Sequence, residues 1–183
     1  MPGRARGPPN REGPTPLPEG RTLRRVRLSD APTLVRHRSG MLRDIGGHPE
    51  ARLRRHERVF GPWVRRELRA RRLWGYLVEG ADGTPLASGI VWLQPRNPSA
   101  RDGATVTPYI FSVFTEPSVR RRGLATAIVR TLLDSAKAAG HSRVELHATE
   151  AGRPIYERLG FRPTRHMRWE PGDERRRRRR RGR

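Results

Sequence analysis

The sequence contains no cysteine, a single lysine and no long apolar run. Without cysteine the chain can form no disulfide, no thiolate metal site and no cysteine nucleophile. Its six histidines do not fall at a His-x-x-x-His or similar spacing, so the sequence predicts no metal site. No apolar stretch approaches the length of a membrane span, about 18 residues, and the N-terminus lacks the apolar region of a secretory signal. We therefore expect a cytoplasmic protein with no membrane partner.

Acidic residues are scarce, at 18 against 40 lysines and arginines, which gives a net charge of +22. A charge of this size is typical of nucleic-acid binders. However, Lys137 is the only lysine, and so strong a bias towards arginine indicates GC-rich coding as much as selection for charge. There is no zinc-finger spacing, no recognisable RNA-binding motif and no regular series of stacking aromatics. Nucleic-acid binding is thus an alternative that the composition allows without favouring it.

Both ends of the chain are polar. Residues 1–20 are rich in proline, glycine and arginine, so burial cannot offset the entropy of ordering them. Residues 171–183 end in a run of arginines, whose mutual repulsion favours an extended chain. We expect both ends to be disordered, and the tail to be either a solvated end or a non-specific anchor for acidic polymers such as nucleic acid. Residues 21–170 remain as one domain.

Helical and strand patterns alternate within this domain. In chain order they predict a strand at 23–28, a helix from 30 to about 44, a second helical region from about 49 to 68, strands at 73–78, 86–93 and 107–114, a helix over 125–136, a strand at 143–148, a short helix at 154–159, and a last strand that includes residues 167 and 169. Gly46 and Gly47 should end the first helix, and Pro62 should kink or split the second. The order predicts a mixed α/β domain.

An anion-binding pattern precedes the helix at 125–136. There Arg120, Arg121 and Arg122 are followed by Gly123. The first N–H groups of a helix lack intrahelical partners, the helix dipole adds positive charge, and a glycine lets a phosphate approach the backbone. These features predict a pyrophosphate cradle, to which the arginines add attraction. No Gly-Lys-Ser/Thr or Gly-x-Gly-x-x-Gly pattern is present, so the loop is neither a P-loop nor a dinucleotide fingerprint.

The loop also belongs to a longer pattern. The run 113–125 contains Arg-x-x-Gly-x-Ala at Arg120, Gly123 and Ala125, and it resembles the acetyl-CoA-binding motif of the GNAT superfamily of N-acetyltransferases. The run 155–161, Ile-Tyr-Glu-Arg-Leu-Gly-Phe, is similar to the C-terminal helix motif of that family, Leu/Ile-Tyr-x-x-x-Gly-Phe. The two runs occur in the family's order, about 30 residues apart, with a predicted helix and strand between them.

The resemblance, which is close over residues 108–165, implies a fold and a cofactor. The fold would be α/β (α+β), with a mixed, mostly antiparallel central sheet flanked by helices. Residues 109–113 would form the fourth strand of the family's sheet and would splay from the fifth, residues 143–148. Acetyl-CoA would enter this gap. Its expected contacts are Phe111, Ser112, Val113, Arg120, Arg121, Arg122, Gly123, Leu124, Ala125, Thr126 and Thr149, the last in place of an Asn that is frequent in the family.

The resemblance also implies catalytic residues. Tyr156 matches a tyrosine that is often the general acid for the departing thiolate, although it could be only a core aromatic. Its reference pKa of about 10 exceeds that of a thiol, about 8.5, so proton transfer is not strongly driven, but the hydroxyl can donate a hydrogen bond to developing charge. Glu145 and His147 share one face of the fifth strand and are candidate bases. Either could instead be structural, with a water chain as the base.

The acceptor is expected to enter near the connection of the first two helices. Met41, Asp44 and His48 would line this entrance, and Asp44 would attract a cationic amine. The sequence thus predicts a monomeric or homodimeric enzyme that transfers an acetyl group from acetyl-CoA to a primary amine, of a small molecule rather than a protein, without a metal. Two alternatives remain: a module that binds nucleic acid or another acidic surface, and a non-catalytic regulator that binds acyl-CoA.

Overall fold

The computed structural model describes most of the chain between its two ends. The described residues are 7–8, 13, 15–98, 100, 103–167 and 169. The arginine-rich tail and much of the N-terminal arm lie outside them. The expected disorder of the residues outside the described ranges, and the division into arm, domain and tail, therefore stay predictions.

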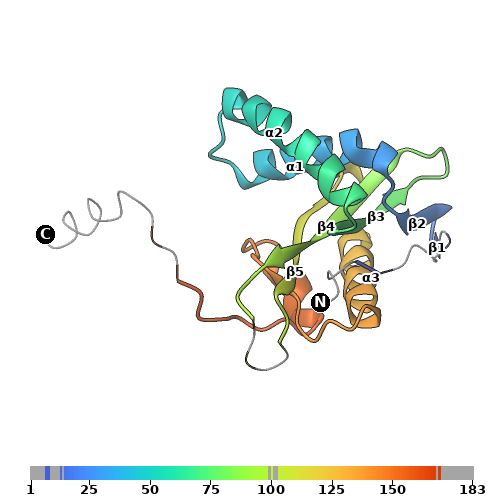
Figure 1. The fold of residues 1–183 in the computed structure, drawn as a ribbon. Helices are drawn as coiled ribbons and strands as arrows, with labels where there is room; N and C mark the ends of the chain where they lie inside the picture. Colours follow the sequence, from blue (N-terminus) through green and yellow to red (C-terminus); the bar gives the residue numbers. More distant parts are fainter. Residues whose placement is uncertain are drawn as a thin grey trace, which may run out of the picture.

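Six strands form one sheet, and helices flank it (Figure 1). The strands are β1 (Thr15–Leu17), β2 (Arg21–Arg25), β3 (Leu73–Glu79), β4 (Pro85–Pro95), β5 (Val106–Thr115) and β6 (Glu145–Leu146). The helices are α1 (Ala31–Ile45), α2 (Glu50–Arg69), α3 (Leu124–Ala138) and α4 (Arg153–Arg158), with 3-10 turns at Leu28–Asp30 and Pro117–Val119. The strands lie in chain order across the sheet, and all neighbours are antiparallel except β5 and β6. The predicted mixed, mostly antiparallel α/β fold is confirmed.

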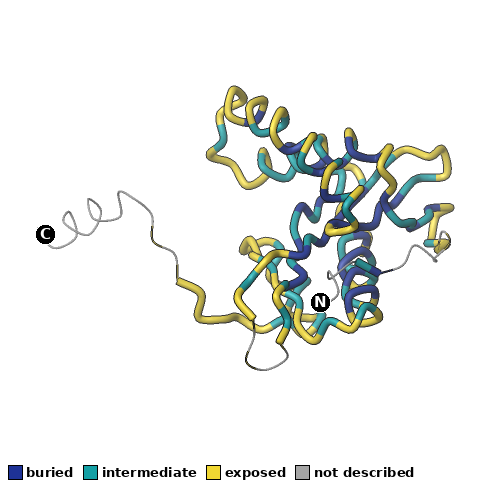
Figure 2. Tube along the Cα trace, viewed as in Figure 1, coloured by how far each residue is buried: buried dark blue, intermediate teal, exposed yellow. Residues whose placement is uncertain are grey.

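The helices cover both faces of the sheet. Figure 1 shows α1 and α2 over one face and α3 over the other. Ile128 and Leu132 of α3 pack with Trp74 of β3, whereas Leu34 of α1 and Val64 of α2 belong to a second core cluster. These side chains are buried, and Figure 2 shows the buried chain following the strands and α3. Burial of each aliphatic side chain contributes about 1.5–3 kcal/mol, so the sheet is held from both sides.

The first two helices show which of the predicted helix caps and helix breakers act in the folded structure. Asp30 is the N-cap of α1, and Gly46 ends this helix with a φ of 79°. A left-handed φ is strained for residues with a Cβ and unstrained for glycine, so Gly46 turns the chain towards α2. In contrast, α2 runs unbroken through Pro62, so of the two expected effects of this proline the split is wrong and the kink stays a prediction. Phe60 and Val64 are buried on either side of Pro62, and this packing outweighs the one backbone hydrogen bond that proline removes.

Both ends of the domain depart from the predictions. β1 lies within residues 1–20, which were expected to be disordered, because its backbone pairs with β2 and Leu17 packs against the core around α3. The last predicted strand is not formed among the described residues, and its Met167 and Trp169 are 91% and 70% exposed. β6 is only two residues long, so it offers this segment little backbone with which to pair.

Candidate active site

β5 changes its pairing in the middle of the strand. Its parallel pairing with β6 ends at Ile110 and Leu146, and further along the strand the described chain offers no parallel partner. On the other edge, Ser88 pairs with Phe114 but Ile90 pairs with Phe111, so β5 carries one extra residue there. A bulge of this kind bends a strand and redirects its side chains. β5 and β6 are the strands that the sequence expected to splay, and they separate at this bulge.

Ser112 lies at the bulge, with a φ of 53°. A left-handed φ in a non-glycine residue costs roughly 1–3 kcal/mol and persists only where the surroundings impose it. Here Ser112 is buried, and its Oγ accepts a hydrogen bond of 3.2 Å from Nη1 of Arg38 on α1. Opposite the bulge, a Cβ on Gly89 would lie 2.6 Å from Cγ2 of Ile128, so only glycine lets α3 approach the sheet this closely. The bulge is therefore held by helices on both faces.

Gly123 begins α3 just beyond this strand. It is the N-cap, with a φ of 78° and a ψ of 0°, and no side chain caps the helix there. The helical ladder starts with the bond from Ala127 N–H to the Gly123 carbonyl, 3.0 Å long, so the N–H groups of Leu124, Ala125 and Thr126 have no intrahelical acceptor. An added Cβ on Gly123 would meet nothing within 4 Å. This open, uncapped helix start fits the anion cradle that the sequence predicts.

The three arginines before Gly123 differ in their contacts. Nη2 of Arg120 lies 2.5 Å from Oδ2 of Asp44, and Nη1 of Arg122 lies 2.6 Å from Oε2 of Glu19. Within the described chain Arg121 has no ion-pair partner, and its φ of 64° adds a second left-handed residue to the loop. Ion pairs exposed to water are weak and exchangeable, so an incoming phosphate can compete for Arg120 and Arg122. Asp44 pairs with Arg120 in this structure, and its expected attraction of a cationic amine stays a prediction.

Tyr156 lies on α4, at the edge of the core on the α3 side of the sheet. Its ring meets Phe161 edge-on, with centroids 5.9 Å apart. Burial raises the pKa of the Tyr156 hydroxyl above 10, and the nearby Tyr109 raises it further. The hydroxyl therefore stays protonated at neutral pH and is available as a donor. The packing also fits the alternative of a core aromatic, so the structure accommodates both interpretations of this residue.

The two candidate bases have different neighbours. The Tyr109 hydroxyl and Nδ1 of His147 are hydrogen-bonded, and the His147 ring lies 5.5 Å from that of His166. The structure thus joins His147 to the strand that carries the bulge. Glu145 is exposed, and its Oε1 lies 3.7 Å from Nη1 of Arg143.

The remaining predicted residues lie around these elements. Thr149 lies in the turn that precedes α4, where its Oγ1 accepts a hydrogen bond of 3.1 Å from Gly152 N–H. The O–H of Thr149 can still donate a hydrogen bond, and its expected contact with the cofactor stays a prediction. Met41 is partly buried on α1, and His48 is partly buried in the loop that leads to α2. His48 lies close enough to His56 to contribute to the lowered pKa of that ring, after burial and Arg38.

Sequence reasoning missed Arg38. Its guanidinium carbon lies 5.8 Å from the ring centre of Phe60 and 5.7 Å from that of Phe111. Burial lowers the pKa of Arg38, and its Nε is buried without a hydrogen-bond partner in the described chain. A signal was available, because Arg38 follows the core residue Leu34 by four positions and so lies on the apolar face of α1.

His37 anchors α1 to the sheet. It is fully buried, and its Nδ1 lies 2.8 Å from Oγ of Ser88 on β4. Burial and the adjacent Arg36 lower the pKa of His37 to about 4, although Glu116 acts in the opposite direction. His37 is therefore neutral at pH 7. We regard it as a structural residue, since its ring is inaccessible and also packs against Phe114.

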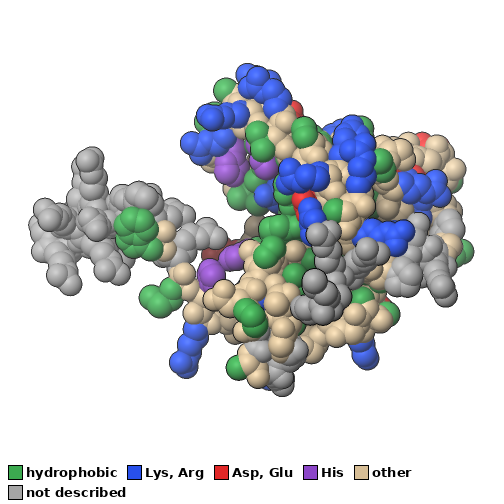
Figure 3. Space-filling model, in the orientation of Figure 1, with side chains coloured by type: hydrophobic (Ala, Val, Ile, Leu, Met, Phe, Trp, Pro, Cys, Tyr) green, Lys and Arg blue, Asp and Glu red, His purple; other side chains and the backbone are tan. Residues whose placement is uncertain are grey.

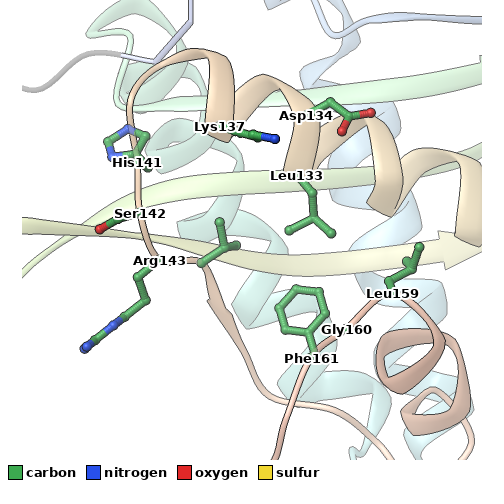
Figure 4. Close-up of a pocket in the computed structure, with 10 residues that line it drawn as sticks. Leu133, Asp134, Lys137, His141, Ser142, Arg143, Leu159, Gly160 and Phe161 are labelled. Atoms are coloured by element: carbon green, nitrogen blue, oxygen red, sulfur yellow. The ribbon is translucent and has the colours of Figure 1, made fainter.

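A separate hollow of about 480 Å³ lies at the other end of α3. Figure 4 shows Leu133 and Phe161 pointing toward each other across it, while Arg143 is directed away. Its lining also includes Lys137 from the last turn of α3. At 1.5 Å per residue, Lys137 is roughly 20 Å along the helix from Gly123. The hollow is therefore distinct from the anion cradle.

Among the residues that the structure describes, no group of three or more His, Cys, Asp or Glu side chains could hold a metal ion. None of the helices in this part of the chain combines the length and the apolar composition that a membrane span requires.

A sheet whose strands part at a bulge, beside a helix that begins open and uncapped at a glycine, defines an acetyltransferase-type α/β domain. Comparison with known families gives the same class. The model of the acetyltransferase (GNAT) family matches residues 42–161, and the chain belongs to that family. The family expected from the two sequence runs is thus confirmed.

Several relatives resemble the chain individually. A GCN5-related N-acetyltransferase from Ralstonia eutropha JMP134 is 27% identical, with a TM-score of 0.76, over 84% of this chain and 99% of that one. A predicted acetyltransferase from Clostridium acetobutylicum, with acetyl-CoA, has the same TM-score at 23% identity and supports the fold, over 84% of this chain and 97% of that one. A glucosamine 6-phosphate N-acetyltransferase from Trypanosoma brucei brucei is 34% identical over 80 residues, 44% of this chain. The match spans about half, 52%, of that relative's length.

Proposed function

We propose that the protein transfers the acetyl group of acetyl-CoA to a primary amine of a small molecule. The observation that carries this proposal is the uncapped start of α3 at Gly123, next to the point where β5 parts from β6. One structural relative was determined with acetyl-CoA, and the curated relative is named for the acetylation of an amino sugar. Both are consistent with an acyl-CoA donor and a small amine.

The described residues fit acetyl-CoA, which would supply an activated acetyl thioester. The N–H groups of Leu124, Ala125 and Thr126 would hold its pyrophosphate, and the open space at Gly123 leaves room for it. Arg121 would add a charge-assisted contact. The backbone of residues 111–113, released from parallel pairing, would bind the extended arm of the cofactor, as one strand binds another.

The chain's own residues would then move the protons. The Tyr156 hydroxyl, kept protonated by its raised pKa, would donate a hydrogen bond to the leaving sulfur. His147 would accept a proton from the acceptor amine through the Tyr109 hydroxyl to which it is bonded, and it can release that proton because it is exposed. Glu145 is a less suitable base, because it is near Arg143 and exposed to water.

The test is a panel of primary amines incubated with acetyl-CoA, with release of free thiol as the readout. Calorimetry with acetyl-CoA alone is run in parallel. Amine-dependent thiol release together with binding supports the transferase. Binding without release for any amine would favour the non-catalytic regulator, and the absence of binding at millimolar acetyl-CoA would exclude both.

A further inference from the structure

The acceptor side of the bulge carries positive charge without an acidic partner. Arg38 reaches it from α1 and donates from Nη1 to Ser112. Within the described chain no carboxylate pairs with Arg38, and its buried Nε has no acceptor. Buried polar groups in folded proteins are nearly always hydrogen-bonded, so an orphan N–H beside a candidate reaction centre indicates a missing partner.

His56 on α2 provides a second, independent observation. Its Nε2 is also buried without a hydrogen-bond partner among the described residues. The His56 ring stacks on Phe60 at 5.2 Å, and Arg38 lies over the same Phe60 ring. Two unsatisfied nitrogen atoms therefore lie around one aromatic side chain, and both belong to groups that can donate hydrogen bonds.

Of the charged groups around this place, Arg38 has no ion-pair partner within the described chain. Asp44 is paired with Arg120, and Glu57 on α2 keeps its negative charge while it accepts a hydrogen bond of 2.6 Å from Ser39. Figure 3 shows histidine side chains on both sides of an indentation between the helices at the top and the C-terminal part of the described chain. The unpaired guanidinium of Arg38 attracts an oxyanion.

We propose that the acceptor amine carries an anionic group, a carboxylate or a phosphate, which Arg38 and His56 bind above Ser112. Arg38 suits this role because a planar guanidinium binds an oxyanion with two parallel hydrogen bonds, and the rings of Phe60 and Phe111 fix its plane. An oxyanion that draws Arg38 outward gives Nε its acceptor. This inference names the substrate class of the proposed transferase and therefore rests on that function.

The experiment compares acceptors with and without an anionic group. Phosphoethanolamine is set against ethanolamine, and β-alanine against β-alaninamide, which separates phosphate from carboxylate recognition. Loss of one charge-assisted contact corresponds to roughly tenfold to a hundredfold in kcat/KM, so we expect one anionic amine to exceed its neutral partner by that factor. Arg38→Met should abolish the preference, and Arg38→Lys should retain part of it, since it keeps the charge without the fork.

Arg43→Met is the matched control. Arg43 lies on the same helix, but it is exposed and pairs with Glu50 at the surface, so the preference should be unchanged. Calorimetry should give Arg43→Met and His56→Leu the wild-type Kd for acetyl-CoA, and thermal unfolding reports whether each variant folds. If Arg38→Met does not fold, Arg38→Lys and His56→Leu decide, because each should weaken the preference.

The outcomes separate the inference from the function on which it rests. Equal turnover of the charged and neutral acceptors, or a preference that survives in the Arg38 and His56 variants, would overturn the anionic acceptor and leave the transferase intact. If acetyl-CoA binds but no amine is acetylated, the transferase itself fails, and the inference fails with it.

Discussion

Replacing Gly123 by alanine tests the anion cradle, and Gly140 supplies a matched control. Both glycines have a left-handed φ, 78° and 81°, and a Cβ on either would meet nothing within 4 Å. They lie at opposite ends of α3. Alanine in this conformation costs about 1–2 kcal/mol at either position. In a domain of this size each kcal/mol lowers Tm by about 2–4 °C, so both variants should unfold a few degrees below the wild type.

Only the Gly123 variant should lose affinity for acetyl-CoA. We expect the new methyl group, which would meet no protein atom within 4 Å, to displace a phosphate from one or two of the N–H groups of residues 124–126. A hydrogen bond to a charged group contributes about 1.5–3 kcal/mol, which corresponds to a Kd that is higher by roughly 10- to 150-fold.

Isothermal titration calorimetry with acetyl-CoA measures this difference directly. The ratio of the two variants' dissociation constants is informative, because the backbone strain is common to both. Equal affinities for Gly123→Ala and Gly140→Ala would refute the assignment of the helix start as the phosphate site. The proposal that the protein binds acetyl-CoA would then lose the observation that carries it.

Three further predictions concern other parts of the chain. Tyr156→Phe should lower kcat by about a hundredfold or more with little change in the Kd for acetyl-CoA, and unaltered turnover in the thiol-release assay would remove Tyr156 from the mechanism. The pKa of His37 is lowered to about 4 from 6.5, so the unfolded chain binds a proton at this residue more readily than the folded chain does. The free energy of unfolding should therefore have its full value above pH 6.5 and fall by roughly 3 kcal/mol towards pH 4. Urea unfolding at several pH values should show a smaller loss for His37→Asn. Deleting residues 171–183 should leave acetyl transfer unchanged and flatten the salt dependence of any DNA binding; an unchanged slope would exclude the tail as an anchor.

Local patterns in the sequence predicted most of the elements. The apolar spacing of residues 125–136 predicted α3, and Gly46 predicted the end of α1. These features depend on neighbours within a few positions, where hydrophobic period and backbone freedom act directly. The split at Pro62 failed for the opposite reason, because tertiary packing on both sides of the proline preserved the helix.

The candidate site was predicted only in part. The helix start at Gly123 and the place of Tyr156 followed from motifs. Arg38 was missed, although its position after Leu34 on the apolar face of α1 was a readable signal. The sequence could not predict that Arg38 bonds to Ser112, because this contact depends on a bulge that turns Ser112 towards α1.

By itself, the sequence determined the family, the order of the elements from β2 to α4 and the glycine at the start of α3, since each depends on residues close to one another along the chain. Tertiary structure alone decided which side chains meet. Arg38 and Ser112 are 74 positions apart, Asp44 and Arg120 are 76 apart, and Tyr109 and His147 are 38 apart. Such contacts depend on strand register, and one extra residue in a strand redirects the side chains that follow, so no local pattern could specify them.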